Sequence, residues 1–180
     1  MKAPFLQSQR LILEPTSLKY LSEDYLSWLN DPEVTDYLEL EQGYTIEALE
    51  KFLKGVEEKE ILFWAIIIKE NNKHIGNIKI DPVNFKHGLC EYGILIGDKN
   101  EWGRGYAKEA SLIVIDYCFK VLNLRKMTLG VVESNINAVK LYKKMGFSIE
   151  GVFIKHRFHN NQYWNTVRMA LFNDKYISAR

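Results

Sequence analysis

A turn with two glycines, which joins an apolar strand to a helix near the middle of the chain, sets the strongest limit on the fold. The predicted strand covers residues 90–97, and residues 107–121 lack glycine and proline over a length that suits a helix. Between them stands the sequence EWGRGYAKEA, residues 101–110. Glycine leaves backbone N–H groups accessible, and a helix N-terminus carries positive potential. The turn therefore suits a pyrophosphate, with a plain helix start as the alternative.

Two basic residues of this stretch, Arg104 and Lys108, would add charge to a phosphate site. Neither standard nucleotide motif fits, however. The Walker lysine is absent, and a G-x-G-x-x-G pattern that begins at Gly103 would need a third glycine where Lys108 stands. The sequence therefore disfavours an ATPase and a dinucleotide-binding protein.

The rest of the chain alternates between helical and strand periodicities. The predicted elements are, in order, a strand at 10–13, a helix at 18–29, a helix from 45, strands at 63–69, 75–81 and 90–97, a helix at 107–121, a strand at 126–132, a helix from 135, and a hairpin of 147–158 and 163–172. This order predicts a mixed α/β sheet of the α+β kind rather than a doubly wound one. We expect one domain over residues 1–180.

Composition argues against several classes of protein. No segment has the roughly 18 uninterrupted apolar residues of a membrane helix, and the first residues lack a secretory signal, so we expect a cytoplasmic protein without a membrane partner. The basic residues are spread over several elements, and the isoelectric point of 7.7 disfavours nucleic acid. Cys90 and Cys118 stand in apolar runs without CxxC spacing, so neither a disulfide nor a metal site is predicted.

The formal net charge of +1 conceals an asymmetry along the chain. Residues 21–60 hold 12 acidic residues and 3 lysines, whereas residues 101–180 hold 13 lysines and arginines and 6 acidic residues. One region would favour a cation and the other an anion, unless both are simply solvated surfaces.

The turn and a later stretch, NINAVKLYKKMGF at residues 135–147, together resemble the GNAT superfamily of acetyl-coenzyme A N-acetyltransferases. RLILEP, WLNDPEV and EGVFIKHRF match as well, so the resemblance covers nearly the whole chain. It implies a mixed, mostly antiparallel sheet with splayed parallel central strands, flanked by helices. Within the superfamily the chain looks most like the branch of ribosomal-protein N-terminal alanine acetyltransferases, which also includes enzymes that act on small amines and amino sugars.

The resemblance implies acetyl-coenzyme A as co-substrate and no metal. The family signature Q/R-x-x-G-x-G/A falls on residues 102–107, where Trp102 replaces the usual glutamine or arginine while Gly105 and Ala107 are kept. The backbone amides of residues 103–108 would bind the pyrophosphate, and the strand before them would pair with the pantetheine arm. The residues assigned to the cofactor are Ile94, Leu95, Ile96, Gly103, Arg104, Gly105, Tyr106, Ala107, Lys108 and Asn135, the last of which is otherwise a helix N-cap.

Two residues receive catalytic roles from the same resemblance. Tyr142 occupies the general-acid position, where a phenol would protonate or stabilise the departing thiolate. Without the family pattern, Tyr142 would be interpreted as a tyrosine of the core. Glu91 stands where many relatives carry a general base that removes a proton from the amine. The alternatives for this step are a structural glutamate and a base supplied by water.

The first two helices and the final hairpin are expected to line the site of the amine acceptor. The candidates are polar and aromatic residues, for which surface packing is the alternative: Trp28, Asn30, Asp31 and Tyr37 on one side, and His156, Arg157, His159 and Trp164 on the other.

These assignments predict an enzyme that acetylates a primary amine by direct attack in a ternary complex, because no serine or cysteine has a recognisable activating partner. A protein N-terminus, a nucleotide-linked amino sugar and a polyamine remain candidate acceptors. A catalytically silent acyl-coenzyme A sensor is the alternative from another class, and a homodimer is left open.

Overall fold

The computed structural model describes residues 2–38, 43–59 and 61–177. The chain divides into two compact units. Unit 1 consists of Met1–Asp81 and Gly93–Val114, and unit 2 of Pro82–Tyr92 and Ile115–Arg180. Strands β4 (Lys73–Asn84) and β5 (Leu89–Ile96) contribute residues to both units. The single domain expected from the sequence stays a prediction.

Eight strands form one sheet in the order β1-β2-β3-β4-β5-β6-β8-β7. The remaining six strands are β1 (Leu6–Gln7), β2 (Leu11–Pro15), β3 (Leu62–Ile68), β6 (Lys126–Val132), β7 (Ser148–His159) and β8 (Gln162–Phe172). Strands β5 and β6 pair in parallel through residues 89–91 and 126–128, while β1 with β2, β2 with β3, β3 with β4, β6 with β8 and β7 with β8 pair antiparallel. The mixed, mostly antiparallel sheet confirms the predicted fold class.

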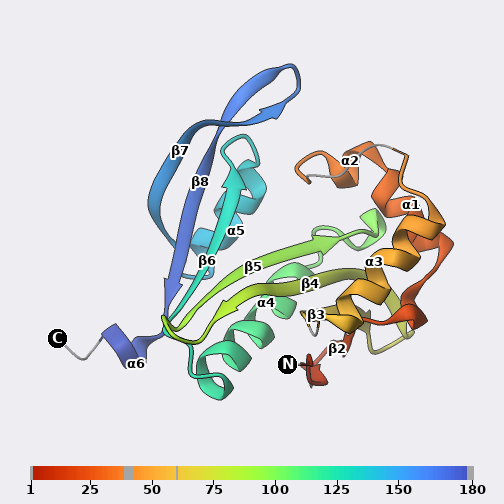
Figure 1. Cartoon of the computed structure of the whole chain (residues 1–180), viewed down its shortest axis with the longest axis horizontal. Coiled ribbons are helices and arrows are strands. Elements are labelled where there is room, and N and C mark those ends of the chain that lie inside the picture. Colours follow the sequence, from red (N-terminus) through yellow and green to blue (C-terminus); the bar gives the residue numbers. More distant parts are fainter. Residues whose placement is uncertain (1, 39–42, 60, 178–180) are drawn as a thin grey trace. The chain divides into compact units, whose positions relative to one another are not determined.

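Helices flank the sheet (Figure 1). They are α1 (Glu23–Asn30), α2 (Pro32–Thr35), α3 (Ile46–Glu58), α4 (Tyr106–Asp116), α5 (Ile136–Lys144) and α6 (Asp174–Ile177), with 3₁₀ turns η1 (Leu18–Tyr20) and η2 (Lys99–Glu101) and a π-helical turn η3 (Tyr117–Val121). Three short elements, β1, α2 and α6, were not predicted, because they are only two to four residues long and too short for a periodic pattern.

The prediction of one helix at 18–29 is wrong in its first turn, because η1 and α1 are separate elements. Leu21 is extended, with φ −67° and ψ 106°, and separates η1 from α1. The break occurs because Ser22 caps α1: its side chain accepts a hydrogen bond from the backbone N–H of Tyr25. Asp31 then caps α2 through the N–H of Glu33, with Pro32 at the first helical position. A periodicity analysis that ignores caps therefore merges two elements.

The core of unit 1 includes a cluster formed by α1, α2 and α3. Its buried members are Tyr25, Trp28, Leu29, Val34, Leu49 and Leu53, and Leu95 of β5 packs against them. Gly97 follows β5, and a Cβ there would lie 2.2 Å from the Trp28 indole. Glycine at this position is therefore what lets α1 lie so close to the end of β5.

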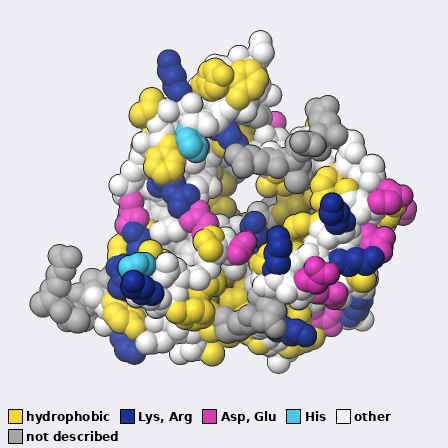
Figure 2. Space-filling view, in the orientation of Figure 1, with side chains coloured by type: hydrophobic (Ala, Val, Ile, Leu, Met, Phe, Trp, Pro, Cys, Tyr) yellow, Lys and Arg dark blue, Asp and Glu magenta, His cyan; other side chains and the backbone are white. Residues whose placement is uncertain are grey.

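Unit 2 contains the long β7–β8 hairpin that the sequence predicts. Asn160 and Asn161 form its turn with φ of 47° and 61°, a conformation that asparagine tolerates better than most residues. Figure 2 shows hydrophobic side chains exposed over this hairpin, and they include Ile154, Phe158 and Tyr163. The preceding helix, α5, is followed by Gly146 at φ 94°, which confirms the predicted left-handed helix end.

Candidate functional site

The two glycines of the turn adopt the left-handed backbone conformation, with φ of 74° at Gly103 and 80° at Gly105. Within the described part of the chain, a Cβ at Gly103 would meet nothing within 4 Å, and one at Gly105 would meet only the Arg10 Nη2, at 3.7 Å. Helix α4 begins directly afterwards, at Tyr106. Backbone N–H groups of such a turn can form an anion-binding concavity at a helix N-terminus. The local geometry therefore fits the phosphate site that the sequence predicts.

Trp102 follows η2 and contacts the end of β5. Its indole Nε1 donates a hydrogen bond of 2.8 Å to the carbonyl of Ile96, the last residue of β5. The side chain is 40% exposed, so one face remains open to solvent. Residues Ile94–Ile96, which were assigned to the pantetheine arm, are half-buried at this end of β5.

The charged residues around the turn are largely paired with one another. Arg104 Nη1 lies 3.3 Å from Glu101 Oε2, and Lys73 Nζ lies 3.3 Å from Glu101 Oε1 and 2.5 Å from Asp98 Oδ2. Lys108 is exposed. Glu101 thus holds the side chain of Arg104 beside the turn, and the predicted contact of Arg104 and Lys108 with phosphate stays a prediction.

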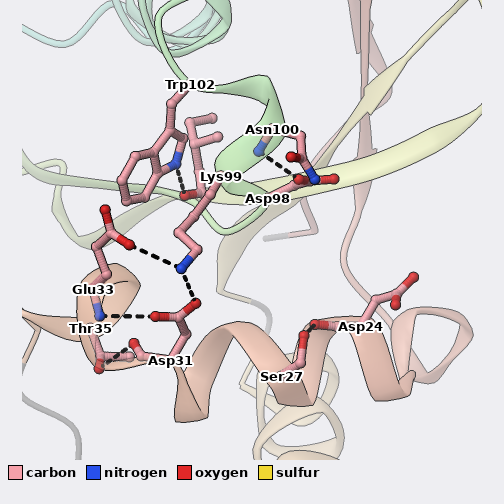
Figure 3. A network of polar contacts seen from close by, with 10 residues as sticks. Asp24, Ser27, Asp31, Glu33, Thr35, Asp98, Lys99, Asn100 and Trp102 are labelled. Atoms are coloured by element: carbon pink, nitrogen blue, oxygen red, sulfur yellow. Dashed lines mark hydrogen bonds and ion pairs between the residues drawn. The ribbon is translucent and has the colours of Figure 1, made fainter.

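A second ion-pair network joins η2 to the segment between α1 and α2 (Figure 3). Lys99 Nζ lies 2.6 Å from Asp31 Oδ2 and 3.0 Å from Glu33 Oε2. Asp31 accepts hydrogen bonds from the Lys99 side chain and from the backbone N–H of Glu33. Both bonds hold the pKa of Asp31 below its usual value, and the bond from Lys99 has the larger effect. Asp31, one of the predicted acceptor residues, is therefore already paired with a cation of the same unit.

The other acceptor candidates of unit 1 differ in exposure. Trp28 is 8% exposed and packs against Gly97, so it lies in the core rather than in the surface packing given as the alternative. The Asn30 side-chain amide donates to the carbonyl of Tyr44 at 2.8 Å, which ties α1 to the start of α3. Tyr37 is half-buried.

One charged residue without a predicted role, Arg10, contacts the turn from outside it and also binds Glu109 of α4. Arg10 donates from Nη1 to the carbonyl of Arg104 at 3.1 Å, and its Nε donates to Glu109 Oε2 at 2.6 Å. Some 94 and 99 residues separate these partners in the sequence. The one available signal was the RLILEP match, which contains Arg10 but assigns it no role.

In unit 2, Glu91 forms a bidentate ion pair with Arg168. Arg168 Nη1 and Nη2 each donate to a different carboxylate oxygen at 2.7 Å, and Thr128 Oγ1 donates to Oε2 at 2.6 Å. A Cβ at Gly130 would lie 2.8 Å from Arg168 Nη1, so glycine leaves room for the guanidinium. The arrangement is the one expected for a structural glutamate, and the role of general base stays a prediction.

Tyr142 lies on α5 among aromatic rings. Its ring centroid is 6.0 Å from that of Tyr92, edge to face, and 5.9 Å from that of Phe147. Burial raises the pKa of Tyr142 to about 12. The phenol is therefore protonated throughout the physiological range, as a hydrogen-bond donor must be.

Asn135 caps α5, because its Oδ1 accepts a hydrogen bond of 3.1 Å from the N–H of Ala138. This is the alternative that the sequence left open for Asn135. A contact with the pantetheine arm stays a prediction.

The candidates on the hairpin occupy β7 and β8. Trp164 pairs with Arg157 across the hairpin, and His156 packs against Phe153 with ring centroids 5.0 Å apart. The side chain of His159 lies outside the described part of the chain. Among the described residues, no helix is both long and apolar enough to cross a membrane.

Several known proteins are similar to this chain in sequence. Residues 10–148 match the family model described as acetyltransferase (GNAT) domain. A spermidine N(1)-acetyltransferase of Escherichia coli is 34% identical over 112 residues, which cover 62% of this chain and 60% of that protein's length. The uncharacterized N-acetyltransferase YoaA of Bacillus subtilis is 30% identical over 167 residues, covering 91% of this chain and 93% of YoaA.

Solved structures are similar over nearly the whole chain. A spermidine N-acetyltransferase of Vibrio cholerae, in complex with CoA and spermine, has a TM-score of 0.85 and 25% identity. The similarity covers 94% of this chain and 99% of that one. A GNAT-family acetyltransferase from Bacillus anthracis has a TM-score of 0.83 and 23% identity, over 95% of this chain and 99% of the other.

Proposed function

Because the chain belongs to the GNAT acetyltransferase family, we propose that it transfers an acetyl group from acetyl-coenzyme A to a primary amine by direct attack in a ternary complex. The observation that carries the proposal is the left-handed two-glycine turn at the start of α4, inside the matched region. Acetyl-coenzyme A supplies the acetyl group as a thioester. The residues of the chain bind it, orient it and stabilise the charges that develop.

The turn would hold the pyrophosphate through the N–H groups of residues 103–108. Open space at Gly103 and the positive end of α4 support this assignment. The edge of β5 at Ile94–Ile96 would pair with the peptide-like groups of the pantetheine arm, and Asn135 would add a polar contact.

Tyr142 would stabilise the departing thiolate by donating a hydrogen bond. A thiol pKa of roughly 8.5 lies about 3.5 units below the value of about 12 for Tyr142, so complete transfer of the phenolic proton would cost about 5 kcal/mol. A hydrogen bond to the sulfur carries no such cost and strengthens as negative charge grows. The proton itself would then arrive from solvent.

Deprotonation of the amine has two candidate routes. Glu91 would accept the proton directly or through a water molecule, although its carboxylate is engaged by Arg168 and Thr128. A water chain that leads to solvent would serve without any side-chain base. The ion pair favours the water route, because a carboxylate paired with a guanidinium is a weaker base.

We propose a polyamine as the acceptor rather than a protein N-terminus, which was the leading expectation from the sequence. Two similar proteins are named as spermidine acetyltransferases, and one of the similar structures holds spermine. The 12 acidic residues against 3 lysines in residues 21–60 suit an acceptor that arrives as a polycation. The ribosomal-protein branch has no comparable support from the relatives.

An acceptor screen tests the proposal. The protein is incubated with acetyl-coenzyme A and spermidine, spermine, N-terminal peptides or amino sugars, and the release of free thiol is followed. We expect the highest kcat/KM with a polyamine, falling as salt rises because the attraction is electrostatic. Preference for a peptide would overturn the acceptor. Binding of coenzyme A without turnover of any amine would favour the acyl-coenzyme A sensor.

A further inference from the structure

We propose that Arg10 is a positioning residue for the cofactor turn, fixing the peptide plane between Arg104 and Gly105 so that its N–H faces the pyrophosphate. This inference rests on the proposed function, because it concerns the same turn. Arg10 lies outside the family signature at residues 102–107, and it acts through the backbone of the turn rather than on the cofactor.

Arg10 is itself held in place from several directions. Its backbone N–H donates to Glu109 Oε1 at 3.0 Å, and its carbonyl accepts from the N–H of Lys69 at 2.9 Å, next to β3. Its guanidinium forms an ion pair with Glu109 Oε2 and lies over the ring of buried Tyr106, with Cζ 4.6 Å from the centroid. Ser8 Oγ also donates to Glu109, at 2.6 Å. The side chain therefore has one well-determined position.

From that position Arg10 Nη1 donates to the carbonyl of Arg104. In a trans peptide the carbonyl and the following N–H point in opposite directions. A carbonyl of Arg104 fixed toward Arg10 thus turns the N–H of Gly105 away from Arg10. Gly105, at φ 80°, could otherwise rotate between many conformations, because glycine has no Cβ to restrict it. Arg10 removes this freedom before the ligand arrives, and pre-organisation of this kind increases affinity.

A direct electrostatic role for Arg10 makes a different prediction. All three nitrogen atoms of its guanidinium have protein partners: Nε and Nη2 contact Glu109, and Nη1 contacts the Arg104 carbonyl. If Arg10 attracted phosphate only as a charge, loss of the nearby Glu109 carboxylate would strengthen binding of anionic coenzyme A. If Arg10 positions the turn, loss of Glu109 would release Arg10 and weaken binding. The two roles therefore predict opposite signs for Glu109→Gln.

The test compares four variants of the full chain: Arg10→Met, Arg10→Lys, Glu109→Gln and, as a matched control, Lys54→Met. Lys54 also belongs to unit 1 and forms an ion pair, with Glu50, and its side chain is 52% exposed against 45% for Arg10. Calorimetry measures coenzyme A binding. Steady-state kinetics use acetyl-coenzyme A and S-acetylpantetheine, a donor that lacks the phosphates.

We expect Arg10→Met to raise the Kd of coenzyme A and the KM of acetyl-coenzyme A about tenfold, with kcat within about twofold, as for the loss of one hydrogen bond to a charged group. Glu109→Gln should weaken binding in the same direction, and Arg10→Lys should restore only part of the affinity. Lys54→Met should bind as the parent does. With S-acetylpantetheine, Arg10→Met and the parent should have the same kcat/KM.

Three results would overturn the assignment. Tighter binding by Glu109→Gln, together with parental affinity in Arg10→Lys, would mean that Arg10 acts as a charge. If Arg10→Met lost kcat/KM equally with acetyl-coenzyme A and with S-acetylpantetheine, the effect of the substitution would be a general structural one. Unchanged coenzyme A binding in Arg10→Met would remove any role. If Arg10→Met fails to fold, the direction of the change in coenzyme A affinity in Arg10→Lys and Glu109→Gln still distinguishes the two roles of Arg10. A parent that binds no coenzyme A would instead overturn the proposed function, and this inference with it.

Discussion

Tyr142 combines an apolar setting with one polar group, its hydroxyl. We expect Tyr142→Phe to lower kcat about 100- to 1,000-fold while the Kd of coenzyme A changes little, because the lost hydrogen bond forms only as charge develops on sulfur. Steady-state kinetics beside a calorimetric titration measure both quantities. Tyr92→Phe is the matched control, since it removes a hydroxyl from the neighbouring ring. Full activity in Tyr142→Phe, with acetyl transfer shown to be rate-limiting, would make Tyr142 a packing residue.

Glu91 has two candidate roles, one as the general base and one as the structural ion-pair partner of Arg168. If it is the base, Glu91→Gln should depress turnover at neutral pH and recover part of it at high pH, where more of the amine is already neutral. If it is structural, the pH–rate profile should keep its shape.

Arg168→Gln separates the two roles of Glu91. It breaks the same ion pair from the other side but leaves the carboxylate present. Equal effects of Glu91→Gln and Arg168→Gln on stability and on kcat would point to the ion pair. A change in the pH–rate profile confined to Glu91→Gln would point to the base.

The turn before α4 is the element whose backbone conformation matters most. We expect Gly105→Val to abolish measurable coenzyme A binding, because a β-branched residue at φ 80° must rotate the backbone that presents the N–H groups. Gly43→Val is a matched control: Gly43 precedes α3 at φ 79°, and no atom of the described residues lies within 4 Å of its Cβ position, so a similar strain of about 1–3 kcal/mol arises away from the turn. Thermal unfolding should show similar losses of stability for Gly105→Val and Gly43→Val. Calorimetry should show loss of coenzyme A binding for Gly105→Val alone. Parental binding by Gly105→Val would contradict the pyrophosphate assignment.

Elements with a strong periodic pattern could be predicted, and most of their ends could not. The strand at 126–132 has both of its predicted ends, whereas β4 runs from Lys73 to Asn84 instead of 75–81. The helix predicted to reach residue 121 continues past Asp116 only as the π-helical η3. Such ends depend on caps and on pairing with neighbouring strands, and neither leaves a periodic signal in the sequence.

The same reasoning separates the predictable part of the site from the rest. The glycine turn is local in sequence, so its form could be expected from ten residues. The ion pair of Glu91 and Arg168 joins residues 77 apart and depends on the register of β6 between β5 and β8. The contacts of Arg10 depend likewise on how β2 and α4 pack. Partners of this kind follow from the fold, and a single sequence does not reveal them.

At the scale of the whole molecule, a half-buried histidine should make stability depend on pH. His74 donates from Nε2 to the carbonyl of Gly76 at 2.9 Å. The rings of Tyr20, Trp28 and Tyr25 surround it, with centroids 4.8, 5.0 and 5.5 Å away. Desolvation by these neighbours lowers the pKa of His74 to about 4, while its hydrogen bonds with Asn77 and Gly76 and the charge of Asp24 act in the opposite direction. The folded chain thus favours the neutral imidazole.

The sign of the effect follows from the two states of the chain. Above pH 6.5 His74 is neutral in both, so its contribution to stability is fully present. Between pH 6.5 and about 4 the unfolded chain takes up a proton that the folded chain does not, and the free energy of unfolding falls by about 1.4 kcal/mol per pH unit. The loss reaches about 3 kcal/mol near pH 4. Other carboxyl groups titrate in the same range, so the informative quantity is the difference between variants.

We therefore expect His74→Gln, which keeps a hydrogen-bond donor for Gly76 but cannot be protonated, to unfold with a shallower dependence on pH than the parent. Urea unfolding at intervals from pH 7 to pH 4 measures the free energy of each protein. His87→Gln is the control, because it makes the same substitution at an exposed histidine. The parent should lose about 3 kcal/mol more than His74→Gln over this range. Parallel curves for the parent and His74→Gln would mean that His74 takes up its proton in the folded chain, with the surrounding rings moving aside to admit water.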